Sequence, residues 1–291
     1  TFFVRGSLPC SMSMVQIVMG IVLAASVVLF SKLFCGYICP LGTVQDLLVK
    51  LRNVIGWKGI EIKNGSVADK VLRVIKYALL FWIFYMTATA SELFCKNLDP
   101  YYAVATGFKG EITLWMSIVT VALVLVCGFF INMFWCKYLC PLGAISNSLK
   151  FWVWIVVLAA AYYVLGLVGV NVPWWALLAV FCVAGYLLEI LCGKPKLQVL
   201  HIMKNDAKCT HCGICNKHCP YGIDIANCKT GAVNAVDCTL CGECTAVCPT
   251  DAIHTGVCVK GGRKCLNVML PAIIAVLLVA FGFWAGDKLS L

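Results

Sequence analysis

Residues 209–220 read CTHCGICNKHCP, and residues 238–249 read CTLCGECTAVCP. Both segments have the spacing Cys-x2-Cys-x2-Cys-x3-Cys-Pro, with which thiolates hold [4Fe-4S] clusters, and the fourth cysteine of each run ligates the other cluster in two-cluster proteins. The sequence therefore predicts two clusters with crossed ligation. We expect the first to be bound by Cys209, Cys212, Cys215 and Cys248, and the second by Cys238, Cys241, Cys244 and Cys219.

Zinc, disulfides and haem are the other uses of so many cysteines. A zinc site favours two pairs rather than two runs of four that each end in Cys-Pro, and cytosolic thiols stay reduced. The haem attachment signature Cys-x-x-Cys-His is absent, and no predicted membrane helix contains a histidine. Intrinsic haem is therefore disfavoured, since membrane haem needs such axial ligands.

Composition places the chain in the membrane class. Of its 291 residues, 62% are hydrophobic and 12% are charged, whereas soluble proteins have about 45–50% apolar and about 25% charged residues. The net charge of +10 is attributed to Lys- and Arg-rich loops on the cytoplasmic side, not to nucleic-acid binding. Because the chain begins with Thr1, we expect residues to be missing upstream.

The predicted fold class is a membrane α-helical bundle with a small α+β bacterial-type 2[4Fe-4S] ferredoxin domain. An N-terminal segment (1–13) precedes a membrane domain (14–192), a ferredoxin domain (193–266) and a C-terminal transmembrane helix (267–291). Apolar stretches of spanning length predict about six transmembrane helices, at about 14–34, 74–90, 112–135, 152–168, 174–191 and 268–284.

A second group of cysteines lies at the ends of two predicted helices. Residues 35–42 read CGYICPLG and residues 136–143 read CKYLCPLG, which predicts a pseudo-repeat of the same topology in both halves. Cysteines four residues apart share a helical face, and the proline that follows ends or bends the helix. Brought together, Cys35, Cys39, Cys136 and Cys140 would bind a further iron–sulfur cluster; a closed zinc site and buried packing cysteines are the alternatives.

The positive-inside rule orients the predicted helices. Lys and Arg concentrate in 36–76, 137–150 and 193–267, which predicts that both Cys-Pro motifs and the ferredoxin domain face the cytoplasm from a prokaryotic inner membrane. Lys32 and Glu189, near inner helix ends, are expected to reach toward the interface.

Polar residues at the opposite membrane face predict a quinone site. Such residues are functional candidates by default, and a quinone needs an aromatic wall, hydrogen-bond partners and a proton acceptor. The alternative is that the tyrosines are interface anchors and the glutamate is solvated. The patch comprises Glu92, Asp99, Tyr101 and Tyr102.

The two Cys-x3-Cys-Pro-Leu-Gly repeats, together with the double cysteine run, resemble the polyferredoxin-type membrane proteins. That group includes NapH-type quinol dehydrogenase components, NosR-type regulators and CcoG-type oxidase accessory proteins. The resemblance extends from Arg5 to Ile253 and implies electron transfer between a quinone pool and partner redox proteins. It differs in the two extra helices predicted at 152–191, which leaves the partner and the direction of electron flow open.

From these features we expect a membrane-bound electron-transfer subunit of a respiratory or related oxidoreductase, of which a quinol dehydrogenase is one form. Its partners would be membrane lipid, quinone, and cytochrome or iron–sulfur subunits. The alternative is a CcoG-like accessory factor that supplies electrons for metal-centre assembly. A redox-sensing role is the third hypothesis, and it would need a signalling domain that these residues do not contain.

Overall fold

The computed structural model describes most of the chain, and its residues form two compact units. The described residues are 14–57, 59–60, 62, 64–90, 100–105, 107, 114–169, 172–191, 198–228, 231–259, 262–266 and 269–290. The helical unit contains Pro40–Ser148 and Trp152–Ile190, and the ferredoxin unit contains Leu8–Cys39, Leu149–Phe151 and Leu191–Leu291.

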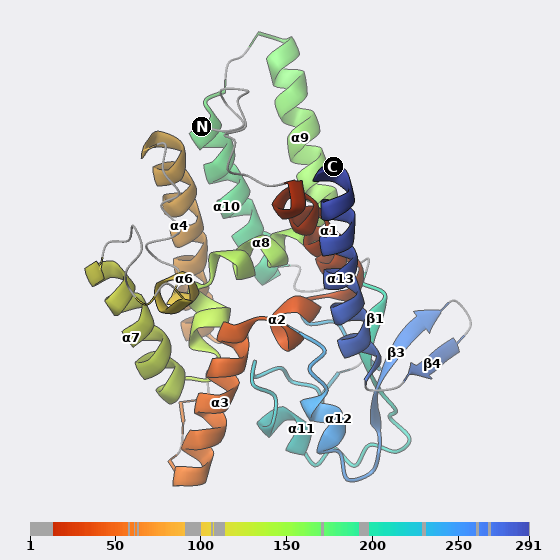
Figure 1. The fold of residues 1–291 in the computed structure, drawn as a ribbon. Coiled ribbons are helices and arrows are strands. Elements are labelled where there is room, and N and C mark those ends of the chain that lie inside the picture. Colours follow the sequence, from red (N-terminus) through yellow and green to blue (C-terminus); the bar gives the residue numbers. More distant parts are fainter. Residues whose placement is uncertain are drawn as a thin grey trace. The chain divides into compact units, whose positions relative to one another are not determined.

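Helices make up the regular structure of the helical unit (Figure 1). In chain order they are α3 (Pro40–Ile55), α4 (Val67–Ala90), α6 (Pro100–Ala105), α7 (Leu114–Phe130), the π-helix η1 (Trp135–Leu139), α8 (Pro141–Leu149), α9 (Trp152–Leu167) and α10 (Trp174–Leu191). Proline opens α3 and α8, as it does at first helical positions, because its missing N–H would have no partner there.

A small apolar core joins α4, α8 and α10. Tyr77 and Leu80 of α4, Ala144 of α8 and Cys182 of α10 pack together with at most 5% of each residue exposed. Gly185 lets α10 approach α8, because a Cβ built there would lie 2.6 Å from Ser148 Oγ. Cys182 is therefore a packing residue, as free cysteines often are.

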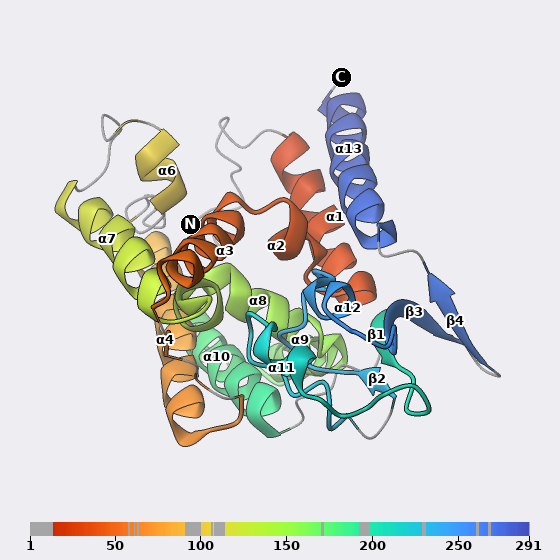
Figure 2. The same cartoon turned by 90° about the horizontal axis from the view of Figure 1, so that it is seen from below.

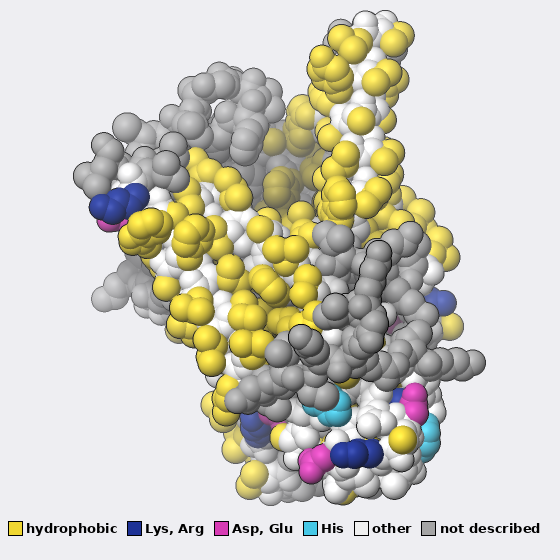
Figure 3. Space-filling model, turned by 90° about the vertical axis from the view of Figure 1, so that its right-hand side faces the viewer, with side chains coloured by type: hydrophobic (Ala, Val, Ile, Leu, Met, Phe, Trp, Pro, Cys, Tyr) yellow, Lys and Arg dark blue, Asp and Glu magenta, His cyan; other side chains and the backbone are white. Residues whose placement is uncertain are grey.

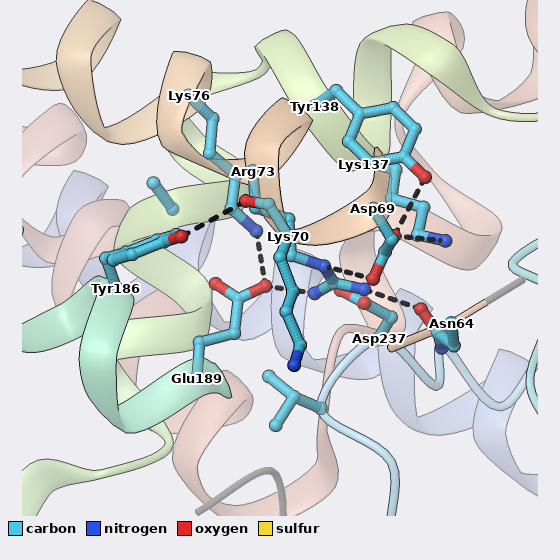
Figure 4. Close-up of polar contacts among 12 residues, drawn as sticks. Asn64, Asp69, Lys70, Arg73, Lys76, Lys137, Tyr138, Tyr186, Glu189 and Asp237 are labelled. Carbon is cyan, nitrogen blue, oxygen red and sulfur yellow. Dashed lines mark hydrogen bonds and ion pairs between the residues drawn. The ribbon is translucent and has the colours of Figure 1, made fainter. Parts of the chain in front are cut away.

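Buried ion pairs link α4 to α10 (Figure 4). Glu189 of α10 accepts hydrogen bonds from Arg73, from Lys76 at 2.7 Å and from Tyr77 at 2.7 Å. The Glu189 side chain is 1% exposed, so the expectation that it reaches toward the interface is wrong. Charges removed from water need such partners, because an unpaired buried charge is very costly.

Three helices are long and apolar enough to cross a membrane: Val67–Thr89, Trp174–Leu191 and Leu270–Lys288. The pair Pro141–Leu149 and Trp152–Leu167, bent by 88°, would make a fourth, and Ile17–Phe30 and Leu114–Phe130 are shorter apolar helices. The described residues thus support a membrane protein with three to four candidate spans, while the count of six and the pseudo-repeat stay predictions.

The ferredoxin unit combines two long helices with a small sheet. It contains α1 (Met14–Phe30), α2 (Leu33–Tyr37), β1 (Leu200–Lys204), α11 (Ile214–Lys217), β2 (Ala232–Val233), α12 (Glu243–Ala246), β3 (Ile253–Val259), β4 (Gly262–Leu266) and α13 (Leu270–Ser290). Helices α1 and α13 lie side by side in both ribbon views (Figures 1 and 2).

The sheet is antiparallel, in the order β2-β1-β3-β4. Ile202 pairs with Val233 on one side and with Thr255 on the other, so β1 lies inside the sheet. The cysteine loops are the segments between β1 and β3, and the sheet therefore fixes the start and the end of the cysteine-rich segment.

Apolar surface covers the helices. Val276, Leu277 and Phe281 of α13 are each more than half exposed, which is typical of a lipid-facing helix rather than of a soluble one. In Figure 3, hydrophobic side chains cover much of the visible surface, and most charged and histidine side chains gather at the lower end of the view.

The ion pairs predict a large difference between two carboxylate variants. Glu189→Gln leaves Arg73 and Lys76 without their shared anion, so we expect a loss of about 3–5 kcal/mol of unfolding free energy, measured by circular dichroism in detergent. Asp46→Asn breaks the exposed Asp46–Lys50 pair and should cost less than about 1 kcal/mol. Equal losses for the two variants would contradict this account.

Candidate iron–sulfur sites

The two cysteine loops have matching backbones. His211 and Leu240, which occupy equivalent positions in the two runs, have φ of 53° and 58°, and Gly213 and Gly242 have φ of 72° and 81°. The left-handed region costs little for glycine, so each glycine turns the chain sharply ahead of a short helix, α11 or α12. Each run thereby curls around a small volume.

Four of the predicted ligands line one cavity. Its walls include Cys238, Cys241 and Cys244 of the second run and Cys219 of the first, which is the set that crossed ligation requires. The remaining wall is mainly apolar, with Ile202 among its members. A group of soft thiols in an apolar pocket fits an iron–sulfur cluster, whose sulfurs and irons suit thiolate ligands.

Thiol pKa values in this cavity depend mainly on burial. Burial raises the pKa of Cys238 to about 12, and it also raises the pKa of Cys219 and Cys244. Free thiols here would therefore be protonated at neutral pH, and a bound metal would have to displace those protons.

The first run is more exposed. Cys212 and His211 are exposed, while Leu240, the counterpart of His211, is 1% exposed. Burial raises the pKa of Cys215, and thiolates at Cys209 and Cys212 are close enough to raise it further. The fourth predicted ligand of this set, Cys248, accepts a hydrogen bond at Sγ from Ala252 N at 3.3 Å.

Residues of α2 and of the turn just before it cover the second loop. Ser31 Oγ donates to Cys238 O at 2.6 Å, and Tyr37 OH donates to Leu240 O at 2.7 Å. Gly36 lies so close to the loop that a Cβ there would be 3.0 Å from Thr239 O. Residues 31–37, which we call the docking corner, thus bring Cys35 of the first Cys-Pro motif to the loop that carries Cys238.

Two buried lysines lie at the same place. Lys32 Nζ pairs with Asp237 Oδ1 at 3.2 Å, and Lys150 Nζ donates to Ser31 Oγ at 2.7 Å and to Val236 O at 2.6 Å. Burial lowers the pKa of Lys150 to about 7, and the Lys32 ammonium acts in the same direction. The protonated form of Lys150 therefore depends on negative charge nearby.

Both Cys-Pro motifs end in the same wide backbone turn. Cys39 N donates to Phe34 O at 2.9 Å, and Cys140 N donates to Trp135 O at 2.8 Å. These bonds join residues five apart, which is the π-helical pattern that is frequent at functional sites. The expected regular α-helical turn at each motif is therefore replaced by a wider one.

Asp69 of α4 fixes the second motif (Figure 4). Its carboxylate accepts hydrogen bonds from Lys137 at 2.9 Å and Tyr138 at 2.8 Å, both between Cys136 and Cys140 in sequence, and from Arg73 at 2.9 Å. The charged pairs hold η1 against α4, so the cysteines sit on an anchored turn.

Gln45 supplies a spare donor beside the second motif. Gln45 is fully buried, its Oε1 lies 3.5 Å from Cys136 N, and its Nε2 has no hydrogen-bond partner among the described residues. A buried amide without a partner is costly, and a sulfur or another acceptor bound at the motif would satisfy it.

The structure brings together some predicted site residues and leaves others untested. Cys35 and Cys39 belong to the ferredoxin unit, and Cys136 and Cys140 belong to the helical unit, so the four-cysteine site stays a prediction. Of the quinone patch, Glu92 and Asp99 lie outside the described residues. Tyr101 and Tyr102 belong to α6, but their side chains also lie outside what the structure describes.

Sequence reasoning missed the residues that hold the second loop. Lys32, expected to reach toward the interface, is instead 4% exposed and paired with Asp237, so that expectation is wrong. Lys150 and Ser31 were not singled out. The only available signal was the position of Asp237 directly before Cys238, and its distant partner cannot be deduced from the spacing of residues.

Known families match both cysteine groups. A 4Fe-4S binding domain matches residues 12–58 and 113–153, which contain the two Cys-Pro motifs, and a 4Fe-4S dicluster domain matches residues 208–253. Together with the relatives described next, these matches indicate the NapH- and NosR-like polyferredoxin family. The two domain matches support iron–sulfur binding, and the relatives support a role in electron transport.

Relatives share part of this arrangement. The chain is 31% identical over 153 residues to the putative electron transport protein YccM of Escherichia coli, covering 50% of this chain and 41% of that protein. It is 30% identical over 128 residues to the ferredoxin-type protein NapH of Haemophilus influenzae, covering 42% and 41%. It is 30% identical over 125 residues to the regulatory protein NosR of Pseudomonas aeruginosa, covering 42% and 17%.

The chain thus spans less than half the length of each of these three relatives. No solved structure matches it. The relatives therefore indicate the family alone.

Close packing of the docking corner predicts the effect of a single methyl group. Gly36→Ala would press a Cβ against Thr239 and separate α2 from the second loop. We expect chelator to remove the second cluster several-fold faster, followed by loss of visible absorbance in anaerobically reconstituted protein. Gly20→Ala is the matched control, because no atom lies within 4 Å of its Cβ position; equal rates in both variants would contradict the packing argument.

Proposed function

We propose that this chain is the membrane-bound electron-transfer subunit of a respiratory or related redox complex, and that electrons pass between its ferredoxin clusters and a membrane-boundary cysteine site. The observation that carries this proposal is the docking corner, in which the first Cys-Pro motif contacts the backbone of the second cluster loop. Hydrogen bonds at 2.6 and 2.7 Å connect the two segments.

Each [4Fe-4S] cluster supplies one-electron chemistry when bound. Cys209, Cys212, Cys215 and Cys248 would hold the first, and Cys238, Cys241, Cys244 and Cys219 the second. The chain's own contribution is to orient the thiols, to exclude water from the second loop and to donate hydrogen bonds near the sulfurs, and these factors set cluster potentials.

A third iron–sulfur site at the Cys-Pro motifs completes the proposed path. The match of the 4Fe-4S binding domain to both motifs supports it, as do their shared wide turns and the free Gln45 Nε2. Within the helical unit, α3, which begins directly after Cys39, also packs against α7, the helix that leads into the second motif. Thiolates from Cys35, Cys39, Cys136 and Cys140 would be the ligands.

The membrane side of the path is a quinone in this proposal. Two reduced clusters would each lose one electron to one quinone, which takes up two protons and becomes quinol; the reverse reaction would reduce the clusters. The patch Glu92, Asp99, Tyr101 and Tyr102 is the proposed quinone site, on the side opposite the cysteines, and the ferredoxin domain would face the cytoplasm because Lys and Arg concentrate in the connected loops.

Crossed ligation predicts which cluster each fourth cysteine affects. Cys219→Ser should change the electron paramagnetic resonance signal of the buried second cluster, and Cys248→Ser that of the exposed first cluster. Cys228→Ser is the control, because Cys228 has no place in either run and its Sγ donates to Ala232 O. If Cys219→Ser and Cys248→Ser altered the opposite clusters, the assignment would be wrong.

Metal content and reoxidation test the function itself. Protein purified without oxygen should contain about eight irons in the ferredoxin part, and more if the Cys-Pro motifs hold a cluster. After reduction with dithionite, a water-soluble quinone should reoxidise the clusters in wild-type protein, and Cys35→Ser with Cys136→Ser should slow this at least tenfold. An iron content near zero refutes the proposal; unchanged reoxidation in the double variant removes the membrane-boundary site from the path.

A further inference from the structure

Lys150 is a buried cation to which no carboxylate of the described residues is bound. It lies in the short connection between α8 and α9, belongs to the ferredoxin unit and is 4% exposed. Its hydrogen bonds among the described residues go to neutral groups, namely the Ser31 hydroxyl and the Val236 carbonyl. Burying an ammonium group against neutral partners alone is costly, so a nearby anion is expected.

Positive charge exceeds negative charge among the described buried groups at this place. Lys32, also 4% exposed, pairs with Asp237, which is 3% exposed, and Lys150 contacts Val236. Cys238, a predicted ligand of the second cluster, follows directly, and its carbonyl accepts a hydrogen bond from Ser31, which also binds Lys150. The two ammonium groups therefore lie beside the segment that carries a predicted cluster ligand.

A thiolate-bound [4Fe-4S] cluster is the anion that fits. It carries net negative charge and gains one more when it is reduced, and its potential depends on net charge, hydrogen bonds and exposure. Burial of the second loop by itself disfavours the added charge, because charge in a low-dielectric site is costly. A fixed cation nearby favours the added negative charge. A buried cation has a larger effect than an exposed one, because solvent and salt screen the exposed charge.

We propose that Lys150 is the countercharge of the second cluster and raises its reduction potential relative to that of the first, so that an electron on this chain rests next to Cys35. This inference rests on the cluster assignment of the proposed function. In this role Lys150 is a positioning residue that binds no iron. Its charge acts on the second loop directly and through Ser31, whose hydroxyl donates to Cys238 O.

The test is an anaerobic redox titration followed by electron paramagnetic resonance, in which the second cluster is the one whose signal Cys219→Ser alters. Lys150→Met, which keeps the length of the side chain but removes the charge, should shift electron sharing toward the first cluster by about tenfold, as expected for one charge at moderate dielectric. For a one-electron couple this is about 59 mV. Lys150→Arg keeps the charge and should change the difference in potential between the two clusters far less.

A variant that removes a negative charge distinguishes an electrostatic role of Lys150 from a structural one. Asp237→Asn removes the carboxylate that pairs with Lys32 at 3.2 Å, so the second cluster's potential should rise. A role that is merely structural would disturb the cluster in the same direction in both variants. Lys217→Met is the matched control, because Lys217 is exposed and lies in the first run; neither potential should move by more than a small part of the Lys150→Met shift.

The outcomes are distinct. Opposite shifts of the second cluster's potential in Lys150→Met and Asp237→Asn support the inference. If Lys150→Met fails to retain the second cluster, an upward shift of that potential in Asp237→Asn supports it. No shift, or shifts in the same direction, overturns it. Spin quantitation on the wild-type protein distinguishes failure of the inference from failure of the proposed function. The proposed function fails if the clusters are absent. The inference fails if the clusters are present but their potentials do not change in the variants.

Discussion

Anchoring of the second cysteine loop by the docking corner is the contact on which the rest of this structure depends. Ser31, Gly36 and Tyr37 each approach a different residue of the loop, through two hydrogen bonds and one close backbone contact. Glycine suits position 36 because a Cβ there would lie only 3.0 Å from Thr239 O. The contact turns a thiol-rich loop, which would otherwise be solvated like the first, into a buried one beside the first Cys-Pro motif.

Buried charged side chains occur in both units, but their pairing differs between the two. In the helical unit, Asp69 and Glu189 each serve several cations, and the network holds the second Cys-Pro motif against α4. At the start of the second loop in the ferredoxin unit, the described buried groups carry more positive than negative charge, with Lys32 and Lys150 near Asp237. Because unpaired buried charge is costly, the first arrangement stabilises a fold, while the second leaves room for an anionic group.

Motif-based reasoning succeeded where the chemistry is local. The ligand spacing in 209–220 and 238–249 predicted a ferredoxin domain, and a matching 4Fe-4S dicluster domain supports it. The Cys-Pro motifs were recognised as a pair, and one family domain spans both. Reasoning from single side chains was weaker: Lys32 and Glu189 were expected to reach toward the interface, yet each is buried in an ion pair with a residue more than a hundred positions away. Amphipathic position alone cannot reveal such a partner.

Reading the chain alone was enough to predict cysteine spacings typical of cluster binding, the apolar stretches and the likeness to polyferredoxin proteins, because each of these depends on neighbours within a few positions along the chain. Only the tertiary structure decided which cysteine loop is buried, that both Cys-Pro motifs adopt a wide turn, and that Lys150 lies against the second loop. Those features depend on which distant segments pack together, and packing is set by shape and charge pairing that a linear pattern does not contain.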